Sequence, residues 1–148
     1  MTKDYLNVFL IEDDEGKRIF FENIFTDSKI AITTNTFHNV KCVMDLLGEE
    51  DILVPEMVWI NKSILEKDNS EFLSEIKSDV KFNTMVILIY SENFKNDEED
   101  DFLVKGANIL MKLPDNYKDM KKIVSEIITI NWQYHTSGFN KNNFIMKV

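Results

Sequence analysis

Three acidic residues follow the first short apolar run of the chain, at a place where their carboxylates could do chemistry. Residues 8–11 are Val-Phe-Leu-Ile, and Glu12, Asp13 and Asp14 come directly after them. Carboxylates held close together repel one another, so such a cluster is tolerated when a divalent cation or a cationic side chain neutralises it. The alternative is a polar loop that caps the next helix, and the residues alone favour neither interpretation.

Polar side chains also follow three later apolar runs, namely Asn61, Ser91 and Lys112. If these runs are parallel strands, their carboxyl ends lie at one edge of a sheet. Sites in such sheets lie in the crevice outside that edge, where the strand order reverses. The residues directly after each run are therefore the candidates for a functional site.

The apolar patterning predicts alternating strands and helices. Continuous runs of a few apolar residues are typical of strands buried on both faces, as in a parallel sheet. Such runs occupy residues 8–11, 57–60, 85–90 and 109–111, and a weaker one occupies 31–36. Stretches with helical spacing lie between them, and the clearest covers residues 120–128. The order predicts an α/β fold, (βα)5, with a doubly wound five-stranded parallel sheet of flavodoxin-like type.

Length, charge and cysteine content exclude several classes of protein. The chain has 148 residues, of which 44% are apolar, and this is typical of one globular domain. Its net charge of −9 argues against binding to nucleic acid or to acidic lipid. The single cysteine, Cys42, makes an intramolecular disulfide impossible. Because no apolar run reaches membrane-span length and the N-terminus does not resemble a signal peptide, we expect a cytoplasmic protein.

Four segments resemble, in order, the motifs of a response-regulator receiver domain, the phosphorylatable switch of two-component signalling. They are Ile-Glu-Asp-Asp at 11–14, Pro-Glu-Met-Val-Trp-Ile-Asn at 55–61, Ile-Tyr-Ser at 89–91, and the Gly-Ala-Asn-Ile-Leu-Met-Lys-Leu-Pro run at 106–114. The intervals between Asn61, Ser91 and Leu113 also match the family pattern without a gap. The resemblance extends from about Tyr5 to Asn131.

The resemblance implies a role for each matched residue. Glu12 and Asp13 take the positions of the magnesium-binding acids, and Ser91 takes that of the switch hydroxyl. Without a phosphoryl group Ser91 has nothing to coordinate, so we expect it to be structural. Leu113 and Pro114 stand where the family has a lysine and a proline joined by a cis peptide bond, and we expect a cis bond here.

Two departures from the family pattern change the expected chemistry. Asn61 replaces the phosphoacceptor aspartate, and an amide oxygen is a poor nucleophile without charge. Leu113 replaces the pocket lysine, while Lys112 lies one position early and should point to the other face of its strand. With one carboxylate fewer, Glu12 and Asp13 should bind magnesium weakly if at all, and no cofactor is required.

The sequence therefore predicts a degenerate, stand-alone receiver, or pseudo-receiver, that is not an enzyme. It would act in signal transduction as a phosphorylation-independent interaction module. Its expected partners are proteins, either a signalling kinase of a phosphorelay or a regulatory protein, or a second copy of the chain. One alternative is a receiver phosphorylated at an unusual acid, Asp68. Another is a small metal-dependent enzyme that uses Glu12 and Asp13 on the same fold.

The last part of the chain lies beyond the receiver pattern. We assign residues 1–131 to the receiver-like domain and residues 132–148 to a C-terminal extension. The extension is too apolar for a free tail, so we expect it to pack on its own domain or on a partner. Residues 144–148 could add a short strand.

Overall fold

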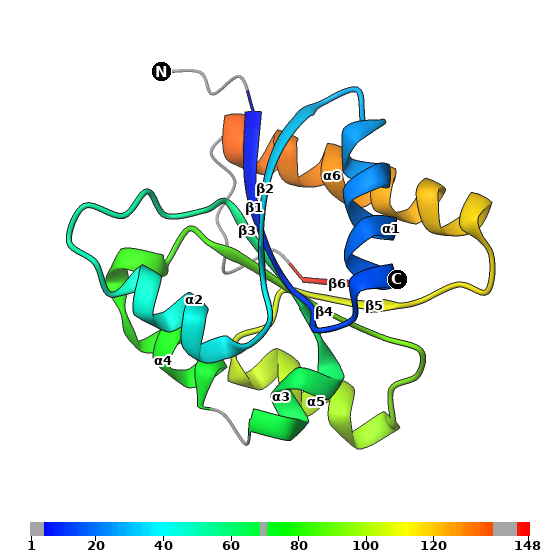
Figure 1. Cartoon of the computed structure of the whole chain (residues 1–148). Helices are drawn as coiled ribbons and strands as arrows, with labels where there is room; N and C mark the ends of the chain where they lie inside the picture. Colours follow the sequence, from blue (N-terminus) through cyan, green and yellow to red (C-terminus); the bar gives the residue numbers. More distant parts are fainter. Residues whose placement is uncertain (1–4, 69–70, 138–144) are drawn as a thin grey trace.

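The computed structural model describes residues 5–68, 71–137 and 145–148 (Figure 1). The strands are β1 (Tyr5–Ile11), β2 (Ala31–Phe37), β3 (Met57–Asn61), β4 (Val86–Ser91), β5 (Ile109–Lys112) and β6 (Met146–Lys147). The helices are α1 (Glu15–Thr26), α2 (Val40–Leu47), α3 (Lys62–Asp68), α4 (Phe72–Ser78), α5 (Asn96–Lys105) and α6 (Tyr117–Ser137), with a 3-10 turn at Val80–Phe82.

All strands belong to one parallel sheet with the order β2-β1-β3-β4-β5-β6. The chain moves from β1 to one edge, returns, and then builds the sheet in the opposite direction. The predicted doubly wound parallel sheet is therefore confirmed. The sheet has six strands rather than five, because Met146–Lys147 adds β6 to the edge of β5.

Helices cover both faces of the sheet, α1 and α6 on one side and α2 to α5 on the other (Figure 1). Side chains along the central strands alternate between two apolar clusters on these faces. Leu10 and Trp59 lie in the cluster with α1 and α6, while Phe9 and Val58 lie in the cluster with α2 and α4. Burial on both sides explains why these strands are continuous apolar runs.

Polar side chains fix the beginnings of the first two helices. Asp14 is the N-cap of α1 and accepts a hydrogen bond from the Lys17 backbone N–H at 2.9 Å. Asn39 caps α2 in the same way and accepts from Cys42 N–H at 2.9 Å. Such caps satisfy backbone donors that have no partner inside the helix. Of the three acids after β1, Asp14 is thus the one that caps a helix.

Three local features differ from the sequence-based expectations. Residues 62–68 form α3 directly after β3, a helix that the sequence analysis did not predict. Helix α6 continues to Ser137, past the end of the receiver pattern. The described residues contain no cis peptide bond, so the expected cis bond at Leu113–Pro114 is wrong. The trans form is the intrinsically preferred one for a bond that precedes proline.

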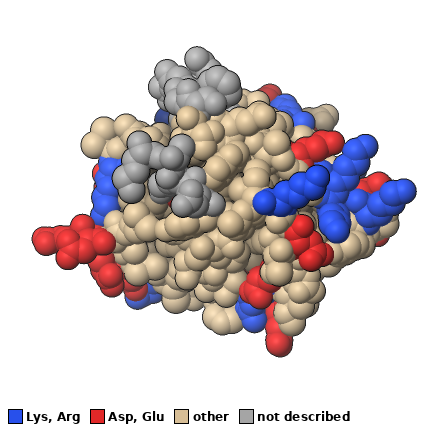
Figure 2. Space-filling view, turned by 90° about the horizontal axis from the view of Figure 1, so that it is seen from above, with Lys and Arg blue, Asp and Glu red and all other residues tan. Residues whose placement is uncertain are grey.

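The end of the molecule at which β1 begins lies opposite the candidate site (Figure 1). On that end, acidic and basic side chains both occur around the periphery, with uncharged surface between them (Figure 2). The negative net charge is therefore not a uniform field over that face. Among the described helices, none is long and apolar enough to cross a membrane.

Candidate functional site

The candidate site lies at the carboxyl ends of three adjacent strands. Glu12 follows β1, and Asn61 is the last residue of β3, the strand paired with β1. Tyr90 is paired with Asn61 across β3 and β4. Parallel register brings these side chains together at the edge where the strand order reverses, which is where sites of this fold class form.

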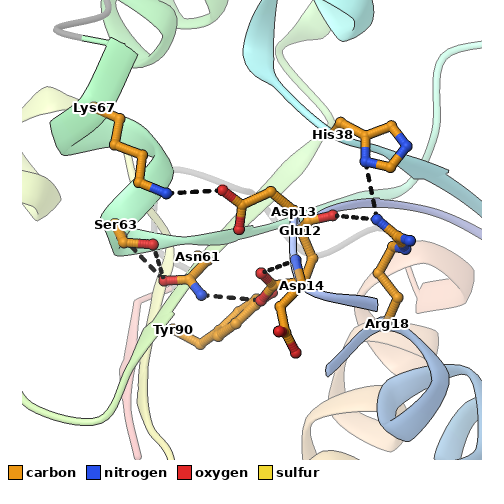
Figure 3. Close-up of polar contacts among 9 residues, drawn as sticks. All are labelled: Glu12, Asp13, Asp14, Arg18, His38, Asn61, Ser63, Lys67 and Tyr90. Carbon is orange, nitrogen blue, oxygen red and sulfur yellow. Dashed lines mark hydrogen bonds and ion pairs between the residues drawn. The ribbon is translucent and has the colours of Figure 1, made fainter. Parts of the chain in front are cut away.

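The Glu12 carboxylate is completely buried and hydrogen-bonded through both oxygens. Its Oε1 accepts from Asn61 Nδ2 at 2.9 Å and from the Tyr90 hydroxyl at 2.6 Å, as Figure 3 shows. Its Oε2 accepts from the Asp14 backbone N–H at 3.1 Å. A buried carboxylate needs such donors to offset its lost hydration. Glu12 is therefore satisfied entirely by groups of this chain.

Both ends of the Asn61 side chain are also engaged. Its Nδ2 donates to Glu12, and its Oδ1 accepts from the backbone N–H and the hydroxyl of Ser63, both at 3.0 Å (Figure 3). An aspartate here would present an oxygen where Nδ2 now donates. Two carboxylate oxygens at that separation would repel each other. The amide is thus what allows residues 12 and 61 to bond directly.

Tyr90 is a site residue that the sequence analysis missed. Its ring is completely buried, and burial raises the pKa of the phenol far above its usual range, with the Glu12 charge adding to the shift. Tyr90 is therefore a neutral donor. The sequence does contain a signal for this role, a tyrosine near the end of an apolar strand. A tyrosine hydroxyl buried in a sheet needs a hydrogen-bond partner, so a polar group was to be expected beside it.

Lys67 of α3 neutralises Asp13. The Lys67 ammonium lies 2.9 Å from Asp13 Oδ2 (Figure 3). The hydrogen bond from Lys67 is the largest influence on Asp13 and lowers the pKa of its carboxyl. Because both side chains are partly exposed, the pair is worth at most about 1 kcal/mol. A cationic side chain thus balances part of the acidic cluster, and sequence reasoning missed it along with α3.

These contacts do not fit a resident divalent cation. Magnesium would have to displace Asn61 and Tyr90 from Glu12, and Lys67 from Asp13. No group of three or more His, Cys, Asp or Glu residues within residues 5–68, 71–137 and 145–148 is arranged to hold a metal ion. Glu12 and Asp13, for which we expected weak magnesium binding if any, bond to amide, phenol and ammonium groups.

The other predicted pocket residues, Ser91, Leu113 and Pro114, have contacts of their own. Ser91 Oγ accepts from the Asn93 backbone N–H at 3.3 Å. Lys112, Leu113 and Pro114 line a cavity of about 750 Å³ near α1 and α6, which Glu12, Asp13 and Asn61 do not line. The structure thus brings Glu12, Asp13 and Asn61 together, while Leu113 and Pro114 line a pocket that none of these three residues borders. Asp68 ends α3, and its side chain lies outside the described part of the chain.

Lys62, next to Asn61, ties the end of β3 to the segment after β4. Its buried ammonium donates to the Asn93 carbonyl at 3.0 Å and lies 3.2 Å from a Glu98 carboxylate oxygen. It also lies 5.5 Å from the centroid of the Phe94 ring. Burial opposes ionisation of Glu98, but hydrogen bonds from the Lys95 backbone and from Lys62 outweigh it and lower its pKa. Sequence reasoning missed this residue as well.

Arg18 of α1 borders the site on its β2 side. Its Nη1 donates to the backbone carbonyl of Glu12 at 3.2 Å and lies 2.9 Å from His38 Nδ1 (Figure 3). His38 follows β2, so this contact links the ends of β1 and β2. The positive charge is directed at backbone and imidazole, not at the Glu12 carboxylate.

Several solved structures resemble this chain. No protein-family model and no curated protein matches its sequence. The phosphorylated cyanobacterial phytochrome response regulator RcpA superposes with a TM-score of 0.73 at 19% identity, over 90% of this chain and 94% of that chain. A response regulator in red light signaling of R. palustris superposes with a TM-score of 0.74 at 15% sequence identity, over 87% of this chain and 92% of that chain. The Mn²⁺-bound form of response regulator Rcp1 superposes with a TM-score of 0.73 at 17% sequence identity, over 91% of this chain and 97% of that chain.

The chain has the receiver fold. At these identities the likeness establishes the architecture, which agrees with the sheet order and with the fold predicted from the sequence. Phosphorylation and bound Mn²⁺ are properties of the two proteins so described. What the present chain does with this fold depends on its own side chains at the carboxyl edge of the sheet.

Proposed function

We propose that this chain is a pseudo-receiver, a signal-transduction module that works through protein contacts and is not phosphorylated at its pocket. The supporting observation is the hydrogen bond from Asn61 Nδ2 to Glu12 Oε1. It joins the position of the phosphoacceptor to a position of the metal-binding acids. The receiver fold, shared with response regulators, supports the signalling role.

The chemistry of phosphoryl transfer supports the absence of phosphorylation. Forming an acyl phosphate requires an ionised carboxylate as nucleophile and cations on the phosphoryl oxygens. Asn61 offers an amide whose oxygen already accepts two hydrogen bonds from Ser63. The Lys67 ammonium, which borders this group of residues, is paired with Asp13. Among the described residues of this site, the acceptor position therefore has no ionised carboxylate, and the Lys67 ammonium is already engaged.

The same contacts argue against a metal-dependent enzyme. A catalytic metal needs ligands with free lone pairs and an open position for substrate. Both Glu12 oxygens accept hydrogen bonds from within the chain. We therefore propose protein partners, a signalling kinase, a regulatory protein or a second copy. The net charge of −9 makes nucleic acid an unfavourable partner.

Incubation with acetyl phosphate and magnesium tests the proposal directly. We expect intact-mass measurement to show no added phosphoryl group on the native chain. An Asp68→Asn variant is the matched control, since it removes the acid that the alternative function requires. A hydroxylamine-labile phosphoryl adduct on the native chain would overturn the proposal, and its loss in Asp68→Asn would identify the acceptor.

A further inference from the structure

The outer edge of β5 is covered by a very short strand of the same chain. In β6, Met146 and Lys147 are paired in parallel with Ile109 and Leu110 (Figure 1). The Met146 N–H donates to the Asn108 carbonyl at 2.8 Å. Two further bonds follow, from Val148 N–H to Leu110 O and from Lys112 N–H to Val148 O, both at 3.0 Å. Backbone bonds of this kind hold any extended segment, whatever its sequence.

The two faces of this edge select different side chains. Met146 packs against the apolar cluster that contains α6. Lys147 points the other way, as successive strand residues do, and its ammonium lies 3.5 Å from Glu99 and 3.8 Å from Asp100 of α5. The edge therefore accepts an apolar side chain on one face and a cation on the other.

Among the described residues, few contacts beyond these hold β6. The strand has two residues, and the flanking Ile145 is 57% exposed. The ion pairs of Lys147 are solvent-exposed and therefore weak. Segments with few buried contacts open locally long before the whole domain unfolds. An exposed strand edge is a template for pairing with another chain.

We propose that the β5 edge is a strand-accepting interaction site, occupied within the chain by residues 145–148. In trans it would accept an extended segment of a protein partner, with an apolar residue at the Met146 position and Lys or Arg at the next. Glu99 and Asp100 select the cation, and the α6 side selects the apolar residue. The inference is separate from the proposed function, because it holds whether or not the pocket takes phosphate.

The surroundings of the edge also leave room for a longer segment. The cavity of about 750 Å³ is lined by Val148 and extends toward α1 and α6. Its walls include Phe20, Leu113 and Met120. A partner segment that continues past the Val148 position would therefore place an apolar side chain in this cavity.

A labelled peptide tests the site. The probe is fluorescein-labelled Asn-Phe-Ile-Met-Lys-Val, the sequence of residues 143–148, and binding is followed by fluorescence anisotropy. Met146→Pro in the full chain removes the N–H that bonds to Asn108 O and should release β6. We expect this variant to bind the probe at least about tenfold more tightly than the native chain. Ile145→Pro is the matched control, because the ladder with β5 in the described residues does not use its N–H.

Charge reversal tests the selectivity. A probe with Glu in place of its Lys should lose binding to Met146→Pro, and adding Glu99→Lys and Asp100→Lys to that chain should restore it. If Met146→Pro does not fold by circular dichroism, Lys147→Glu replaces it as the variant with a weakened β6. Failure of a folded variant to bind the probe, or equal binding of both probes, would overturn the proposal. Dimerisation of the native chain that Met146→Pro abolishes would also overturn it, in favour of a second copy.

Discussion

The Asn61 amide nitrogen lies 2.9 Å from Glu12 Oε1, so the ends of β3 and β1 are joined by a buried side-chain hydrogen bond. Tyr90 donates to the same oxygen from β4. One carboxylate thus connects three adjacent strands. Because Glu12 is completely buried, its bonds have a large effect on stability, and each donor can be removed separately.

Replacing Asn61 with aspartate should destabilise the fold. A second carboxylate would face Glu12 where Nδ2 now donates, and like charges in close contact disfavour ionisation of both. We expect about 1–3 kcal/mol less stability at pH 7, measured by urea unfolding. Repulsion raises the pKa of the new aspartate in the folded state, so the loss should shrink as pH falls toward about 4. Magnesium should also reduce this loss of stability, because a divalent cation offsets the repulsion between the carboxylates. Equal stability of Asn61→Asp and the native chain at pH 7 would contradict this account.

The Tyr90 hydroxyl should contribute to stability through Glu12. Tyr90→Phe keeps the buried ring and removes one donor from the carboxylate, so we expect a cost of about 1–3 kcal/mol. The Tyr90→Phe and Glu12→Gln variants with their double variant form a mutant cycle that isolates the pair. A coupling energy near zero would show that the 2.6 Å contact contributes nothing.

Asp13 should titrate differently without Lys67. The pKa of Asp13 is lowered in the folded state by the hydrogen bond from Lys67. The ion pair therefore stabilises the fold fully at pH values above the ordinary aspartate pKa of about 3.9. This stabilisation is lost as the pH falls through the lower pKa of Asp13 in the folded state. NMR titration should show the Asp13 pKa moving up in Lys67→Ala. Lys41→Ala removes another exposed ion pair, with Asp45, and should leave Asp13 unchanged. An unchanged Asp13 pKa in Lys67→Ala would rule out the pairing.

Lys62→Met should loosen the segment between β4 and α5. The substitution keeps the length of the side chain but leaves the Asn93 carbonyl and Glu98 without their buried cation. We expect about 2–3 kcal/mol of destabilisation and faster amide hydrogen exchange over residues 92–98. Lys105→Met is the control, because its ion pair with Asp101 is exposed. Equal exchange over residues 92–98 in the two variants would argue against a role for Lys62.

The sequence predicted the sheet well because burial on both faces leaves continuous apolar runs at β1, β3, β4 and β5. It predicted the grouping of Glu12 with Asn61, since both stand at the carboxyl ends of central strands. Helix α3 was not predicted, because only Ile64 and Leu65 among its seven residues are apolar. Two apolar positions are too few to show a helical period.

The partners within the site were harder to predict than its members. Lys67 reaches Asp13 from the last turn of α3, so missing that helix also hid the cation. Tyr90 looks like one more apolar strand residue until the register places it beside Asn61. The bond before Pro114 is trans, although the family resemblance implied a cis bond. Pairwise contacts depend on register and helix placement, which a pattern of apolar residues does not specify.

The buried phenol of Tyr90 sets an alkaline limit for this fold. Its pKa is raised by burial and by Glu12, so it releases its proton far more readily in the unfolded chain than in the folded one. The stability that it contributes is complete below the unfolded pKa of about 10 and declines above it, by about 1.4 kcal/mol for each further pH unit. The ultraviolet absorbance of tyrosinate would therefore rise for Tyr90 only as the domain comes apart. In a variant with Tyr5, Tyr117 and Tyr134 replaced by phenylalanine, this absorbance would report base-induced unfolding.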